Sequence, residues 1–223
     1  MITEPQFVRD FTHREFFWLR VFVCCLFLGR AWEGIFWDLP LRAFFWDQNL
    51  LEGVVTILTG DTWQHYVTNK SIPLDAIINF LGKMMGFFWL GCAVFVLFVK
   101  QEWRWGKWVL YTASFSLLVL ALLFFKDLFM AWGQFWEYSI QVTAPLVLAH
   151  LIYGGQNTPR FRWGLKIAIA ITFFSHGLYA YGYYPQPGTW QQWTMNILGF
   201  QDNIAAKQFL VVAGVLDLSL IHI

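Results

Sequence analysis

Six long apolar runs alternate along the chain with shorter segments that carry polar residues, Gly or Pro. The runs cover residues 16–37, 75–99, 108–125, 136–153, 164–184 and 204 to the end. Each is about 20 residues long, and a helix of that length, rising 1.5 Å per residue, crosses a hydrocarbon core of roughly 30 Å. The pattern therefore predicts an all-α fold: a polytopic membrane helix bundle of about six transmembrane helices, forming one domain over residues 1–223.

The segments between the runs predict interfacial structure. Residues 38–74 are interrupted by Pro40, Gly60 and Pro73 and suit short amphipathic helices that lie against the membrane face as an extracytoplasmic connector. Residues 1–15 are polar and predict a cytoplasmic tail. The last run reaches Ile223 without a polar flank, which favours a truncated C-terminus. A run with a polar residue inside it, followed by an aromatic exit, occurs at residues 16–46 and again at 164–193, which predicts two related halves.

Composition supports a membrane protein. The chain is 58% hydrophobic and only 13% charged, about half the charge of an ordinary soluble domain. Many of its 14 Trp and eight Tyr residues stand at the ends of the runs, where such rings prefer the headgroup level of a bilayer. The net charge of +1 argues against a nucleic-acid partner. The three Cys residues lie inside the runs, without metal-ligand or disulfide spacing, and predict helix packing.

The distribution of basic residues predicts the orientation. With the N-terminus inside, the inner segments hold eight Lys and Arg residues and the outer segments hold four. The positive-inside rule therefore favours a multi-pass protein of the cell inner (plasma) membrane with a cytoplasmic N-terminus.

Several ionisable residues stand inside the predicted spans, where a charge needs a partner or a wet cavity. Counting 1.5 Å per residue puts Arg30 about 21 Å and His176 about 18 Å from the inner helix ends, and Lys83 about 12 Å below the outer face, at one common level. These groups predict an outward-facing ligand pocket rimmed by Trp63 and Trp193. The pocket residues we expect are Arg30, Glu33, Lys83, Glu137, Gln141, His176 and Trp190. The alternative is an internal network that pairs Arg30 with Glu33 and Lys83 with Glu137 and fixes helix register. A lone carboxylate in the last run, Asp217, should face the bundle interior.

Other chemistry finds little support. His150 and His176 lie on consecutive predicted spans, but their depths differ by roughly 13 Å, which disfavours a bis-histidine haem site. We expect His150 instead to lie at a helix end and to contact headgroups or carbonyls. No metal-ligand spacing and no nucleophile, phosphate-loop or dinucleotide motif is present, so the sequence indicates no metal site and no catalytic residue. Gly82 and Gly86 form a G-x-x-x-G that predicts close approach of a neighbouring helix.

At FFSHGLYAYGYYPQPG and FLVVAGVLDL the chain resembles the DoxX-like family of integral membrane proteins, over about residues 174–217, with a fainter echo at residues 29–91. The shared pattern is a His-Gly in one helix, an amphipathic connector, and a second helix with a small residue and an acid one turn apart, here Gly214 and Asp217. Arg30 stands where the echo of His176 would fall. The resemblance implies a compact helical bundle, and in some members a link to quinone-dependent oxidation.

These observations leave three functions open. The first is a non-catalytic membrane subunit or small-ligand-binding protein, the second a quinone-linked redox subunit, and the third a small-solute transporter. The expected surroundings are the lipid bilayer and either a membrane protein partner or a second copy of the chain.

Overall fold

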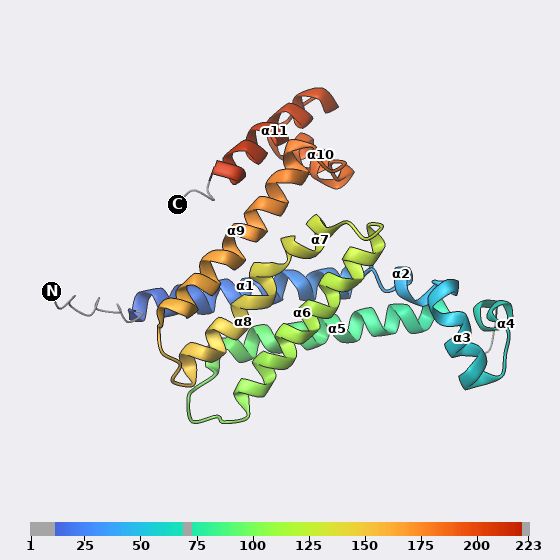
Figure 1. The fold of residues 1–223 in the computed structure, drawn as a ribbon, viewed down its shortest axis with the longest axis horizontal. Helices are drawn as coiled ribbons and strands as arrows, with labels where there is room; N and C mark the ends of the chain where they lie inside the picture. Colours follow the sequence, from blue (N-terminus) through green and yellow to red (C-terminus); the bar gives the residue numbers. More distant parts are fainter. Residues whose placement is uncertain (1–11, 69–72, 220–223) are drawn as a thin grey trace.

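Helices dominate the part of the chain that the computed structural model describes, residues 12–68 and 73–219. Within these ranges the structure has eleven helices and no strand, which confirms the all-α prediction (Figure 1). Most of the predicted tail and the last four residues of the final predicted span lie outside the described residues.

Each predicted span corresponds mainly to one helix, although the run of residues 136–153 also includes the end of a shorter helix. These six helices are α1 (His13–Phe36), α5 (Leu74–Phe98), α6 (Gly106–Asp127), α8 (Ser139–Ile152), α9 (Pro159–Tyr181) and α11 (Asn203–Ser219). The predicted connector forms three short helices, α2 (Arg42–Phe45), α3 (Gln48–Thr59) and α4 (Trp63–Thr68). Two further helices, α7 (Trp132–Glu137) and α10 (Gly188–Leu198), precede α8 and α11.

Two of the described helices, α5 and α6, are long and apolar enough to cross a membrane. With 25 and 22 residues they extend for about 37 and 33 Å at 1.5 Å per residue. The other four long helices are shorter or more polar. Helix α8 has only 14 residues, α11 has 17, and α1 carries Arg20, Arg30 and Glu33 within its length.

Helices α1 and α5 pack antiparallel at a glycine crossing (Figure 1). A Cβ atom on Gly34 would lie 2.8 Å from the Gly86 Cα, and one on Gly86 would lie 2.8 Å from the Ile35 backbone nitrogen. Real Cβ atoms do not approach other atoms so closely, so the two backbones meet only because side chains are missing there. The predicted role of the G-x-x-x-G in helix packing is confirmed, with Gly86 the closer contact.

Helices α9 and α11 form a second pair with the same kind of crossing. A Cβ atom on Gly214 would lie 2.5 Å from the Tyr181 nitrogen and 2.8 Å from the Gly177 carbonyl oxygen. In both pairs a long helix leads through a short-helix connector into a second helix that crosses the first at glycine. The two pairs therefore share this order of elements, and the relation between two halves stays a prediction.

Helix α8 lies between the two pairs, with contacts to α1 and α9, and α6 packs against α8. The core around them contains the fully buried side chains of Phe27, Trp89, Leu117 and Leu148. The Trp89 indole donates a hydrogen bond of 2.9 Å to the Ser116 hydroxyl, so its single polar atom is satisfied. Because α7 contacts α9 and α8 contacts both α1 and α9, the segment from α7 to α8 touches both helix pairs.

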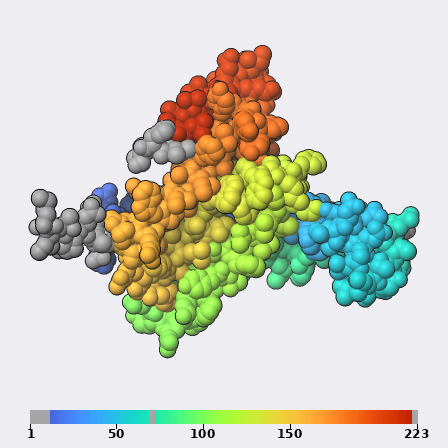
Figure 2. Space-filling model, in the orientation of Figure 1, coloured from blue at the N-terminus to red at the C-terminus, as the bar shows by residue number. Residues whose placement is uncertain are grey.

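Two lobes project from this central bundle (Figures 1 and 2). One consists of α9 to α11, and the other of α3 and α4. At the base of the second lobe Lys126, in the last turn of α6, donates a hydrogen bond to Asp47, which also caps the N-terminus of α3. The Asp47 carboxylate therefore ties this lobe to the central bundle.

Candidate functional site

Polar side chains of the bundle gather at the junction of α7 and α8. Glu137 ends α7, Tyr138 links the two helices, and Gln141 lies in the first turn of α8. Successive helical residues differ by about 100° in direction, so neighbouring side chains here face different helices. Because α8 touches both α1 and α9, the junction supplies polar groups to both helix pairs.

Arg30 of α1 forms the first cluster. Its Nε and Nη2 donate to the Gln141 Oε1 at 2.9 and 2.7 Å, and its Nη1 donates to the Glu33 Oε2 at 2.5 Å. The guanidinium carbon lies 4.8 Å from the centre of the Tyr138 ring. Only 17% of the Arg30 side chain is exposed, so these partners replace the water that the charge would otherwise bind. The predicted pair of Arg30 with Glu33 is confirmed.

His176 of α9 forms the second cluster. Its Nδ1 lies 3.2 Å from the Glu137 Oε1, and its Nε2 lies 3.9 Å from the Asp217 Oδ2. The imidazole also packs against the Trp190 ring, with 4.4 Å between ring centres. Gly177 and Gly214 bring α11 close to α9, and Asp217 follows Gly214 by about one turn. A protonated imidazole here would face a carboxylate on each side.

A pocket of 360 Å³ opens beside His176. Its other walls come from α10 and α11, and most of them are apolar or aromatic. The lining residues are His176, Trp190, Trp193, Thr194, Ile197, Leu198, Phe209 and Leu210. Small-molecule sites in proteins typically combine such walls with a few polar groups, and this volume lies at the lower end of their range.

The structure thus divides the seven predicted pocket residues. Arg30, Glu33 and Gln141 belong to the first cluster, and Glu137, His176 and Trp190 belong to the second. The clusters are linked by the short stretch from Glu137 to Gln141 rather than by a shared cavity. Of the seven, His176 and Trp190 line the 360 Å³ pocket.

Lys83 and Trp63 lie elsewhere. The Lys83 side chain is exposed on α5 and has no hydrogen bond or ion pair with any residue in the described ranges. It follows Gly82 and is therefore turned by about 100° from that residue of the crossing. Glu137, which we expected to pair with Lys83, pairs with His176 instead. Trp63 is in α4, where it lines a different pocket with Gln48 and Glu52 of α3. Trp193 does line the pocket beside His176, as predicted.

Two residues of these clusters were absent from the predicted set. Asp217 was expected only to face the interior, and the structure gives it a partner, His176. Tyr138 is 5% exposed and was not anticipated at all, although it stands inside an apolar run between Glu137 and Gln141. A large polar aromatic in that position is a signal that could have pointed to the junction.

The remaining candidates have structural roles. The His150 Nε2 lies 3.0 Å from the Gln156 carbonyl oxygen, and the ring stacks on Phe161, which confirms the expected carbonyl contact at a helix end. Cys24 and Cys92 are buried in α1 and α5, as expected for packing residues, whereas Cys25 is exposed on α1, so the prediction was wrong for that residue. Across the described residues, no group of three or more His, Cys, Asp or Glu side chains is arranged to hold a metal ion.

No protein-family model, curated protein or solved structure matches the chain. The resemblance to the DoxX-like family therefore depends only on the residues quoted for it above.

Proposed function

We propose that this chain is a six-span protein of the cell inner membrane that binds a small amphipathic ligand in the pocket beside His176. The observation that carries the proposal is an imidazole placed between two carboxylates at the wall of an apolar, aromatic pocket. The absence of a catalytic motif from the sequence favours a binding protein or membrane subunit over an enzyme.

Exposed apolar side chains support insertion of more helices than α5 and α6. On α1, Trp18 and Phe22 are 57% and 44% exposed, and on α11, Val212 and Leu216 are 59% and 61% exposed. Contiguous apolar faces of this kind suit lipid better than water. Helix α1 also packs along α5, so it shares the depth of a helix that is itself long enough to cross.

The two ends of the bundle differ in charge, which supports the proposed orientation. One end comprises the start of α1 and the loops α5–α6 and α8–α9, and we call it the basic end. Its basic residues are Arg14, Lys100, Arg104, Lys107, Arg160 and Arg162. The positive-inside rule assigns this end to the cytoplasm, which puts the pocket beside His176 in the outer half.

The lining suggests how a ligand would bind. An apolar or aromatic body would pack against Trp190, Leu198 and Phe209, and one hydrogen-bonding group would meet the His176 imidazole. Glu137 fixes the orientation of that imidazole through its Nδ1. The His176 Nε2 lies 3.9 Å from Asp217, which is too far for a hydrogen bond, so a polar group of the ligand would satisfy this nitrogen and the site favours amphipathic molecules.

The test compares two matched tryptophan substitutions. Leu198→Trp adds bulk at the pocket, whereas Ile204→Trp adds the same bulk at an exposed position of α11 outside it. Lipophilic molecules would be extracted from each protein purified in detergent and identified by mass spectrometry. We expect one compound to be retained by the wild type and by Ile204→Trp and lost from Leu198→Trp. Equal retention by both variants, or no compound in the wild type, would contradict the proposal.

A quinone-linked redox subunit is the second candidate. A quinone ring can stack on Trp190 while its oxygen accepts a hydrogen bond from His176, and the flanking Glu137 and Asp217 could replace a proton that the imidazole passes on. Reduction of a quinone to a quinol consumes two electrons and two protons, so a separate electron donor would be required. The ultraviolet spectrum of the extracted compound, before and after chemical reduction, separates this candidate from simple binding.

A further inference from the structure

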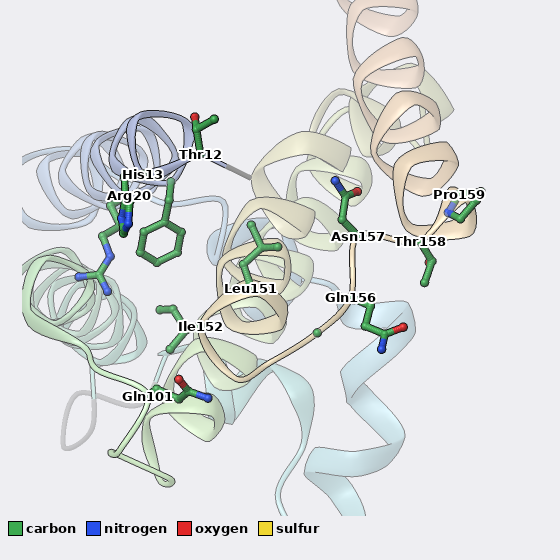
Figure 3. A pocket seen from close by; sticks show the side chains of 12 residues that line it. Thr12, His13, Arg20, Gln101, Leu151, Ile152, Gln156, Asn157, Thr158 and Pro159 are labelled. Atoms are coloured by element: carbon green, nitrogen blue, oxygen red, sulfur yellow. The ribbon is translucent and has the colours of Figure 1, made fainter. Parts of the chain in front are cut away.

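A second and larger cavity lies at the basic end of the bundle, away from the pocket beside His176. This cleft has a volume of 760 Å³ and is formed by the first two turns of α1, the α5–α6 loop and the α8–α9 loop (Figure 3). Three segments that are far apart in the sequence therefore meet around one space. The function proposed above makes no use of it.

The cleft combines an apolar floor with a polar rim. Its apolar lining side chains, which we call the floor, include Phe16 and Ile152, and its polar lining side chains, which we call the rim, include His13, Gln101 and Gln156. The described residues that line the cleft include no acidic side chain. Neither amide side chain, that of Gln101 or that of Gln156, hydrogen-bonds to another described residue, so both remain available to a ligand.

Positive charge surrounds the cleft. Arg20 lines it and reaches the C-terminal end of α5, where its Nη1 donates to the Leu97 carbonyl at 3.0 Å and its Nη2 donates to the Val99 carbonyl at 2.6 Å. These bonds hold the guanidinium in place without a carboxylate partner in the described chain. The basic end adds the charges of Arg14, Lys100, Arg104, Arg160 and Arg162. Glu15 and Glu102 are the acidic residues described on the same segments, so the surroundings of the cleft keep a net positive charge.

We propose that this cleft binds the headgroup of an anionic phospholipid of the cytoplasmic leaflet. The phosphate would take hydrogen bonds from His13 and the two Gln amides in the positive field of Arg20, and the acyl chains would follow the apolar floor into the bilayer. Basic clefts between helices at the cytoplasmic face suit such headgroups. A free phosphate would gain nothing from Phe16 and Ile152, and a choline headgroup would bring a second cation toward Arg20.

The test places negative charge at the rim without removing a structural contact. Gln101→Glu with Gln156→Glu adds two carboxylates to the cleft, and Gln192→Glu adds one at an exposed position of α10 as the matched control. Native mass spectrometry in a neutral detergent would measure binding of phosphatidylglycerol and of phosphatidylcholine to each protein. Soluble glycerol 3-phosphate would be added as a competitor to distinguish a free anion from a lipid.

We expect the wild type and Gln192→Glu to bind phosphatidylglycerol at least tenfold more tightly than phosphatidylcholine, and the double variant to lose this preference. Glycerol 3-phosphate should not displace the lipid at equal concentration. Equal binding of the two lipids, full binding by the double variant, or displacement by glycerol 3-phosphate would each overturn the proposal. An unchanged unfolding temperature of the double variant serves as the check that it is folded.

Discussion

The glycine crossing of α1 and α5 yields the sharpest prediction about the fold. Gly86→Ala adds one methyl group whose carbon would lie 2.8 Å from Ile35, whereas Gly91→Ala adds the same methyl group on the same helix with no atom within 4 Å. The two variants therefore differ only in what the methyl group meets. Comparing them separates close helix packing from any general effect of alanine in α5.

The size of the effect follows from the distances. Ordinary van der Waals contacts of a Cβ begin near 3.4 Å, so α1 and α5 must separate by at least 3.4 − 2.8 = 0.6 Å to accept Gly86→Ala. A gap of that size forfeits roughly a quarter or more of the attraction between the facing atoms. Overpacking of this kind typically costs about 1–3 kcal/mol, which is the loss we expect for Gly86→Ala.

Reversible unfolding in mixed detergent micelles, followed by circular dichroism, would measure both variants against the wild type. We expect Gly86→Ala to lower the free energy of unfolding and Gly91→Ala to leave it unchanged or slightly raised. The reasoning would be refuted if Gly86→Ala were as stable as the wild type, or if the two variants lost the same amount.

Two further predictions concern the polar contacts. Gln141→Leu removes both hydrogen bonds that Arg30 makes to the amide, so it should lower the free energy of unfolding by about 1.5–3 kcal/mol. Gln192→Leu, at an exposed position of α10, should leave the free energy of unfolding unchanged. Unfolding of the two variants in parallel checks this. The hydrogen bond from Lys126 holds the pKa of the Asp47 carboxyl below its ordinary value of 3.8, so its stabilisation is present above the unfolded-state pKa and lost as the pH falls through the folded-state pKa. Asp47→Asn, which can still cap α3, should therefore be less stable at pH 7. It should also lose less stability than the wild type as the pH falls below the unfolded-state pKa of Asp47, and an equal loss in both proteins would contradict this.

Helix positions followed closely from the sequence because apolar runs and their interruptions act locally. Gly60 and Gly182 end α3 and α9 in the left-handed conformation, and Pro73 precedes the first turn of α5. Such residues set helix ends regardless of what packs nearby. The split between α7 and α8 at Tyr138 was missed because the run of residues 136–153 contains no Gly or Pro at that point.

The candidate site was harder to predict because depth along a helix does not give direction around it. Counting residues put Arg30, Lys83 and His176 at one level, but the glycine crossing of α5 leaves Lys83 exposed. The sequence also could not show that Asp217 of the last helix meets His176, since that contact depends on the close approach of Gly177 and Gly214. Residues three apart in one helix, such as Arg30 and Glu33, were paired correctly because local geometry suffices.

The central claim, ligand binding beside His176, is tested most directly by rebinding the extracted compound to His176→Leu and Lys83→Met. Both residues were expected in one pocket from the sequence, and the structure places only His176 at the pocket wall. Equilibrium binding should weaken at least tenfold for His176→Leu and stay at the wild-type value for Lys83→Met. Wild-type affinity in His176→Leu, or an equal loss in Lys83→Met, would contradict the account.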